Sequence, residues 1–308
     1  MRGLAILLGL SACAAPQADE AHPLAGVIDF HCHSGPDLLP RSVTDLEIAR
    51  IAKRAGMRGI VLKNHFTMTA GRAALAMREV EGLEVFGGVV LNRAVGGINP
   101  EAVRAMMRME GRRGRVVWLP TFDAENHVRH AKEDRPFVPV VRGGAPVPEL
   151  AEVFTLVAQG DLVLATGHSS VDESLVLIGA AKKAGVKKIL VTHAMADPVD
   201  ATEDQLRQLA ATGAILECVW ATHIAGPDAP TASGRAQKRV TVPEYAKAIL
   251  ALGAGHFLIS SDLGQALNPI HTDGLRAFIA GLREQGLTAG DVDRVARQNP
   301  ARLLGLEP

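Results

Sequence analysis

The sequence has few cysteines, few aromatic residues and no excess charge of either sign. Lysine plus arginine and aspartate plus glutamate each number 33, so the chain has no net field that would draw it onto nucleic acid or anionic lipid. Its three cysteines form no recognisable disulfide framework and no CxxC metal pattern. Aromatic residues make up only 4%, which disfavours a site that binds sugars or nucleobases by stacking. No apolar run reaches the roughly 20 residues that a membrane-spanning helix needs.

Apolar residues, by contrast, are plentiful. They make up 47% of the 308 residues, and charged residues make up 21%. This balance supplies enough apolar side chain for a sizeable core and excludes a disordered or fibrous chain. The length fits two small domains or one large α/β domain, so the number of domains has to come from the pattern of elements.

The first residues resemble a targeting segment. Arg2 supplies a positive charge, residues 4–10 form a short apolar run, and Leu10-Ser11-Ala12-Cys13 resembles a bacterial lipobox, after which a peptidase cuts and the cysteine receives lipid. The resemblance implies a signal peptide over residues 1–12, a lipid anchor on Cys13 as the one membrane contact, a tether over 13–24, and a periplasm-facing place in the cell envelope. The alternative is a mis-called start codon, in which case the protein is cytoplasmic.

Short runs rich in valine, isoleucine and leucine alternate with longer amphipathic stretches from Gly26 onward. This alternation predicts a parallel sheet whose strands are joined by crossover helices. Eight strands are predicted, at residues 26–30, 59–63, 84–91, 115–120, 162–166, 188–192, 214–219 and 257–261.

Helix boundaries are well marked between these strands. Four capping boxes, in which a hydroxyl residue is followed three positions later by glutamate or glutamine, begin at Thr44, Ser170, Thr202 and Thr241. Helix-ending glycines stand before four of the strands, at Gly56, Gly185, Gly213 and Gly253. Eight such units favour a single-domain (β/α)₈ TIM barrel, of class α/β, over residues 25–308. No GxGxxG turn follows the first strand, which disfavours a doubly wound dinucleotide-binding fold.

Histidines collect where the predicted strands end. The first strand is followed by His31 and His33, the fifth by His168, the sixth by His193, and the eighth by Asp262. Residues two apart on a strand point the same way, so His31 and His33 form a ready bidentate site for zinc or a related divalent ion. Because the C-terminal ends of barrel strands converge on one mouth, all five residues are expected to meet there.

The order of these five residues along the strands resembles the amidohydrolase superfamily of metal-dependent barrels. The tail over residues 298–306 looks like the closing helix of many members, and the resemblance extends from Asp29 to Leu306. It implies that one or two divalent metals, zinc first and manganese, iron or nickel as alternatives, activate a water. It also implies that Asp262 both binds metal and acts as general base. The metal ligands that it implies are His31, His33, His168, His193 and Asp262.

One departure from that pattern concerns lysine. Many binuclear members carry a carboxylated lysine at the end of strand four, but residues 115–120 contain none. Lys63 and His65 instead follow the second strand and share a face that should point into the mouth. Three interpretations of Lys63 are open: a carbamate that bridges two metals, an ammonium that holds a substrate carboxylate or stabilises an oxyanion, or a side chain that snorkels past the rim.

Further mouth residues are predicted to bind substrate. Arg93 follows the third strand, and Asp123 and His127 open the stretch 122–147, which is too long for an ordinary connection and lies on the active-site side of a barrel. His65 belongs to the same group. Glu217, inside the seventh strand, is a candidate to hydrogen-bond a metal ligand.

The leading hypothesis is therefore a metal-dependent hydrolase that cuts an amide, lactone or ester of a small molecule. Two alternatives remain open at this point. One is a mononuclear metal-dependent decarboxylase of the same superfamily, and the other is a lipid-anchored barrel that binds metal or solute without turnover. Neither the substrate nor the oligomeric state can be read from the residues.

Overall fold

The structure is a computed structural model that describes residues 23–307. The predicted signal peptide and most of the predicted tether lie outside the described residues, and both stay predictions. The strands are β1 (Ile28–Cys32), β2 (Gly59–Leu62), β3 (Glu84–Val90), β4 (Gly114–Trp118), β5 (Val141–Arg142), β6 (Ala145–Pro146), β7 (Val163–Ala165), β8 (Lys188–Val191), β9 (Ile215–Val219) and β10 (Phe257–Ser260).

The helices alternate with these strands. They are α1 (Asp45–Arg54), α2 (Ala70–Glu79), α3 (Pro100–Arg108), α4 (Glu125–His130), α5 (Leu150–Gln159), α6 (Val171–Lys183), α7 (Glu203–Ala211), α8 (Ala232–Arg235), α9 (Val242–Leu252), α10 (His271–Glu284), α11 (Ala289–Asp293) and α12 (Asn299–Leu304). None of these helices combines the length and apolarity of a membrane span.

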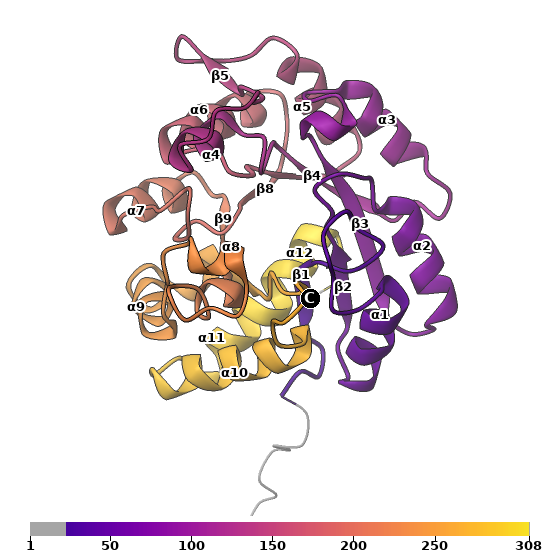
Figure 1. Cartoon of the computed structure of the whole chain (residues 1–308), viewed down its shortest axis with the longest axis vertical. Coiled ribbons are helices and arrows are strands. Elements are labelled where there is room, and N and C mark those ends of the chain that lie inside the picture. The colour runs from indigo at the N-terminus through magenta and orange to yellow at the C-terminus, as the bar shows by residue number, and fades with distance from the viewer. Residues whose placement is uncertain (1–22, 308) are drawn as a thin grey trace, which may run out of the picture.

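Eight strands form one sheet in the order β1-β2-β3-β4-β7-β8-β9-β10, and neighbours in this order run parallel. Helices α1, α2, α3, α5, α6, α7, α9 and α10 lie around the outside of the strands (Figure 1). The predicted (β/α)₈ barrel in a single domain is therefore confirmed, and each of the eight predicted strands overlaps an observed one.

The predicted capping boxes close as expected. At Thr44, Ser170, Thr202 and Thr241, the side chain and the backbone of the cap exchange bonds with the third helical residue. The long stretch 122–147 is not structureless, because it holds α4 and the hairpin of β5 and β6. These elements are too short to show a hydrophobic period, which is why the sequence predicted only a long loop there.

The barrel closes where β10 meets β1. The backbone of Asp262 donates to the carbonyl of His31 at 2.9 Å, and the backbone of His33 donates to the carbonyl of Leu263 at 2.9 Å. Gly264 continues this seam with φ +120°, and a Cβ there would lie 1.8 Å from the His33 carbonyl oxygen. Only glycine combines that conformation with that approach.

A register shift in β1 sets which side chains face the mouth. The side chain of Phe30 points into the barrel interior. Because side chains alternate along a regular strand, Cys32 would be expected to point inward as well. The pairing of β1 with β2 shifts between Asp29 and Cys32, as a β-bulge does. Cys32 packs instead in the outer core between sheet and helices, and His31 and His33 both reach Asp262.

The barrel interior is a packed core of its own. Its buried side chains come from all eight strands of the barrel and from α12, and they include Phe30, Phe86, Trp118, Leu190, Leu258, Leu303 and Leu304. Asn299 at the start of α12 donates to the carbonyl of Phe257 at 2.6 Å, so α12 closes the N-terminal end of the barrel. The opposite end is left for the site.

Replacing Leu304, which is 3% exposed, by alanine is expected to lower the free energy of unfolding by about 2 to 5 kcal/mol, because a cavity opens under the barrel. Denaturant unfolding followed by circular dichroism measures this change. The matched helical control is Leu250→Ala, at a position that is 52% exposed, which should change stability by no more than about 0.5 kcal/mol. Equal effects of the two substitutions would contradict the role of α12.

Candidate metal centre

Two histidines of β1 and the aspartate after β10 meet at the barrel mouth. Asp262 Oδ1 lies 3.0 Å from His31 Nε2 and 3.1 Å from His33 Nε2. Within residues 23–307, these three form the one set of three His, Cys, Asp or Glu residues whose ligand atoms all lie within 4.8 Å of one another. Asp262 has φ +51°, in the left-handed region that aspartate adopts more readily than most non-glycine residues.

The donor set suits a divalent metal. Two imidazole nitrogens and a carboxylate oxygen are ligands that zinc and related ions accept, and atoms bound to one metal at about 2.0–2.1 Å lie roughly 3 Å from one another. The observed separations match that spacing. Two buried imidazole nitrogens in the same region, His33 Nδ1 and His193 Nδ1, have no hydrogen-bond partner, which is unusual for buried polar atoms.

Glu217 orients His31. His31 Nδ1 lies 3.1 Å from Glu217 Oε1, while the backbone of His193 donates to Glu217 Oε2 at 3.0 Å. Ser260 Oγ donates to the same carboxylate at 2.5 Å. A carboxylate that accepts a hydrogen bond from Nδ1–H keeps the proton on Nδ1 and leaves the lone pair of Nε2 free to bind a metal. Glu217 thus contacts the ends of β1, β8 and β10 with one carboxylate, and the predicted hydrogen bond to a candidate metal ligand is present at His31.

Burial and charge set the protonation of this group. Burial opposes a charge on His31, but the carboxylates of Asp262 and Glu217 outweigh it and raise the pKa of His31 to about 9. Burial likewise opposes ionisation of Asp262, yet His31 and His33 hold the pKa of that carboxyl well below its usual range. In the metal-free protein at neutral pH, His31 is therefore protonated. Its positive charge takes the place of the charge that a bound metal would supply.

Lys63 lies directly beside this group. Its side chain is 1% exposed, and its Nζ lies 3.0 Å from His31 Nε2. Burial lowers the pKa of Lys63 to about 8. The interpretation in which Lys63 snorkels past the rim is therefore wrong, because the amine ends inside the site and not in solvent.

Imidazole and phenyl rings surround the mouth. Successive ring centroids lie 3.9 to 6.3 Å apart, in the order His31, His33, His65, Phe122, His168, His193 and back to His31. Burial lowers the pKa of His65 and of His168 well below the usual value, and it lowers the pKa of His193 to about 4. These rings are therefore neutral at physiological pH, the state in which histidine can bind a metal.

Of the remaining predicted residues, His168 and His193 lie at the mouth, and Arg93, Asp123 and His127 lie in the segments that follow β3 and β4. His168 and His193 follow β7 and β8 at the mouth but do not join the three-residue set, and His168 Nδ1 instead lies 2.8 Å from Nδ1 of His127 on α4. Asp123 accepts bonds from the backbone of Arg93 at 2.9 Å and from Arg135 at 2.7 Å, so both of its oxygens hold the loop. The exposed Arg93 side chain lines a separate hollow beside the β5–β6 hairpin. The metal-binding roles of His168 and His193 stay predictions, and so do the substrate-binding roles of Arg93, Asp123 and His127.

Some residues at the mouth carried no sequence signal. Thr121 Oγ1 lies 2.8 Å from Nδ1 of His65, and Asn92 donates to the carbonyl of His65 at 3.0 Å. Phe122 stacks on the His65 ring at 3.9 Å. Threonine, asparagine and phenylalanine in loops are common, so only their position after β3 and β4 could have indicated them.

A comparison with protein-family models matches residues 26–217, well over half of the chain, to a family described as a family of unknown function (DUF6282). The chain belongs to this family. The match covers β1 to the middle of β9, and so includes His31, His33, Lys63 and Glu217 of this DUF6282 protein, while Asp262 lies beyond it. A comparison with curated protein sequences gives no match.

Solved structures resemble this DUF6282 chain over nearly its whole length. An organophosphorus hydrolase from Deinococcus radiodurans is 18% identical with a TM-score of 0.59, covering 92% of this chain and 93% of that one. An amidohydrolase from Pseudomonas aeruginosa is 13% identical with a TM-score of 0.58, covering 91% and 95%. A 2,6-dihydroxybenzoate decarboxylase from Rhizobium is 11% identical with a TM-score of 0.54, covering 91% and 99%. At these identities the likeness shows a shared barrel fold, as the sequence resemblance implied.

The pKa of about 9 for His31 predicts how metal affinity depends on pH. Below pH 9 a metal must displace the proton from Nε2, so affinity should rise about tenfold per pH unit from pH 7 to 9 and level off above. Competition for zinc with a chromophoric chelator across this range measures the slope.

The Glu217→Gln variant tests the cause of this pH dependence. Removing that carboxylate lowers the pKa of His31, so the zinc affinity should stop rising at a lower pH than in the native sequence. An affinity that does not change between pH 7 and 9 in the native sequence would contradict this description of the site.

Proposed function

We propose that this protein is a metal-dependent hydrolase of the amidohydrolase type, acting on an amide, lactone or ester of a small molecule. The observation that supports this proposal most is the convergence of His31, His33 and Asp262 at the barrel mouth, where their three ligand atoms all lie within 4.8 Å of one another and are close enough to share one divalent metal. Zinc is the first candidate, and manganese, iron and nickel suit the same donors. The shared fold with an amidohydrolase and an organophosphorus hydrolase is consistent with it.

Asp262 is suited to receive the proton of the attacking water. Its Oδ1 is the oxygen that meets His31 and His33, whereas its Oδ2 makes no hydrogen bond to any residue of the described range. The side chain is 19% exposed, while those of His31 and His33 are nearly fully buried. Asp262 thus presents a free oxygen toward the open side of the site. A divalent metal held beside it would polarise the substrate carbonyl and lower the pKa of water toward 7.

Two roles for Lys63 fit its position. As a carbamate it would supply a bridging oxygen ligand and allow a second metal, with His168 and His193 as further ligands. As an ammonium it would stabilise the negative charge that develops on the substrate carbonyl oxygen. Both roles need the amine inside the site, where its Nζ lies.

A mononuclear decarboxylase is the second candidate. It is favoured by one observation, that the described residues bring together a single three-residue metal set. The decarboxylase from Rhizobium shares the fold. Release of carbon dioxide from carboxylate substrates, without hydrolysis of esters or lactones, would favour this candidate over the hydrolase.

Metal content tests the site directly. Protein prepared with added zinc is expected to contain at least one metal per chain by elemental mass spectrometry, and His31→Ala should lose it because two ligand atoms cannot hold the ion alone. His256→Ala, at an exposed position before β10, is the matched control and should retain full metal. Absence of metal from the native sequence, or equal content in the His31 variant, would refute the proposal.

The Lys63→Ala variant distinguishes the two roles of the lysine. A fall from about two metals to one would support the carbamate, and an unchanged single metal would support the ammonium.

Activity should depend on Asp262. In a panel of lactones, esters and amides, the substrate that is hydrolysed should lose about 10²- to 10⁴-fold in kcat/KM with Asp262→Asn, because the amide cannot accept the proton. Asp273→Asn, at a side chain that is 66% exposed, is the matched control and should behave as the native sequence does. Full activity in the Asp262 variant would exclude it as the general base.

A further inference from the structure

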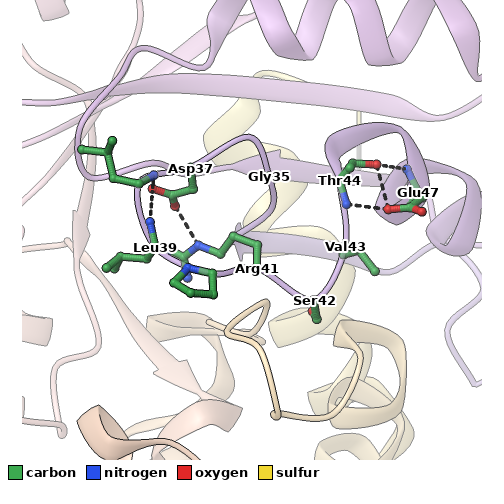
Figure 2. A pocket seen from close by; sticks show the side chains of 10 residues that line it. Gly35, Asp37, Leu39, Arg41, Ser42, Val43, Thr44 and Glu47 are labelled. Atoms are coloured by element: carbon green, nitrogen blue, oxygen red, sulfur yellow. Dashed lines mark hydrogen bonds and ion pairs between the residues drawn. The ribbon is translucent and has the colours of Figure 1, made fainter.

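Arg41 has a buried guanidinium that only one residue binds. It lies in the loop between β1 and α1, and its Nε donates to Asp37 Oδ2 at 2.7 Å (Figure 2). The other oxygen of Asp37 accepts from the backbone of Leu38 at 2.6 Å, so the loop itself fixes this carboxylate. Asp37 therefore holds the Nε side of the guanidinium and leaves both terminal nitrogens free.

This loop is joined to the loop that carries Asp262. Arg41 pairs with Gln265 in an antiparallel bridge, and the backbone of Ser42 donates to the carbonyl of Gly264 at 2.9 Å. The side chain of Gln265 in turn donates to the carbonyl of Asp262 at 2.9 Å. Arg41 is thereby fixed at the edge of the candidate metal centre.

The terminal nitrogens of Arg41 are short of partners. The side chain is 4% exposed, and Nη2 is buried without any hydrogen bond. Arg72 nearby also has one buried nitrogen without a hydrogen bond, Nη1, but its Nε and Nη2 both bind Asp45, at 2.6 and 2.8 Å, whereas Arg41 meets its aspartate through Nε alone. A buried cation with an unused donor is costly, so such a group is expected where a ligand completes its bonding.

The charge of Arg41 also acts on the site. Burial is the main cause of the lowered pKa values of His33, Lys63 and His65, and Arg41 lowers each of them further. Arg41 also lines a hollow of about 440 Å³ that is formed by residues between Gly35 and Glu47, in the loop after β1 and the first turn of α1, and that is large enough for a small molecule.

We propose that Arg41 binds a carboxylate of the substrate, and that the substrates are therefore carboxylate-bearing esters, lactones or amides. This inference rests on the proposed function, because it assigns a substrate class to the same site. With Nε occupied, the two terminal nitrogens form the planar fork that matches a carboxylate. Arg41 is the one cationic side chain among the residues that line the hollow, so the hollow lacks the cluster of positive charges that a phosphoryl group favours. Its two carboxylates are already bonded, Asp37 to Arg41 and Glu47 to the backbone of Thr44.

Glutarate, a small dicarboxylate, is the binding probe. Isothermal titration of the zinc-loaded full chain should detect glutarate, and Arg41→Gln should weaken its binding about 10- to 100-fold, which is the effect of losing a hydrogen-bonded charge. Arg41→Lys keeps the charge without the fork and should bind with intermediate affinity. Arg207→Gln, a half-exposed position on α7, is the matched control and should bind as the native sequence does.

Circular dichroism and the thermal midpoint establish that each variant is folded. If Arg41→Gln does not fold, the lysine variant tests the proposal alone. Glutarate binding that is absent from the native sequence, or that persists in full without Arg41, would overturn the inference. Full binding without Arg41 would indicate that a carboxylate of glutarate binds the metal instead.

Two esters separate this inference from the proposed function. Mono(4-nitrophenyl) glutarate carries the carboxylate, and 4-nitrophenyl pentanoate is its neutral counterpart. The native sequence should prefer the charged ester, and Arg41→Gln should lose that preference, whereas the control Arg207→Gln should keep it. Hydrolysis of both esters without preference would reject the carboxylate site and leave the hydrolase standing. Arg41-dependent glutarate binding without hydrolysis of either ester would support the carboxylate site and reject the hydrolase.

Discussion

The seam between β1 and β10 is the constraint on which the rest of this molecule depends. His31 and Asp262 are 231 positions apart in the chain, yet a backbone hydrogen bond of 2.9 Å joins them where the barrel closes. The same closure brings His33 against Leu263 and permits only glycine at position 264. Ring closure therefore fixes the backbone on both sides of the candidate metal centre before any metal binds, which limits the conformational entropy lost when a ligand is taken up.

Charge balance is the second theme of the mouth. Glu217 is a buried carboxylate and Asp262 a partly buried one, and His31, Lys63 and Arg41 are the cationic groups around them. Burying any one of these charges alone would be strongly unfavourable, so each depends on the others. The site is consequently most stable when its positive and negative charges balance. Binding of a metal, a proton or an anionic substrate changes the net charge of the site and so changes that balance. Protonation, metal binding and substrate choice are thus coupled in one cluster.

Much of the fold could be predicted because its signals are local. Capping boxes such as that at Thr44 and glycines such as Gly56 mark helix ends within a few residues, and apolar runs mark the strands between them. The barrel rule then placed five site residues at one mouth. Arg41 could not be predicted, because its importance lies in an unused nitrogen that only the surrounding structure reveals. The short elements in the stretch 122–147 likewise gave no periodic signal.

The sequence by itself determined the order of elements, the closed barrel and the residue types that end each strand, since these follow from hydrophobic period, caps and spacing. The tertiary structure alone decided which of those residues meet. The register shift in β1 turns His31 and His33 toward Asp262, and packing brings the amine of Lys63 to within 3.0 Å of His31. The tertiary structure also places His168 beside His127 and not among the three residues His31, His33 and Asp262. The reason is physical: period and propensity act within a few residues, whereas ligand geometry depends on contacts between strands far apart in the chain.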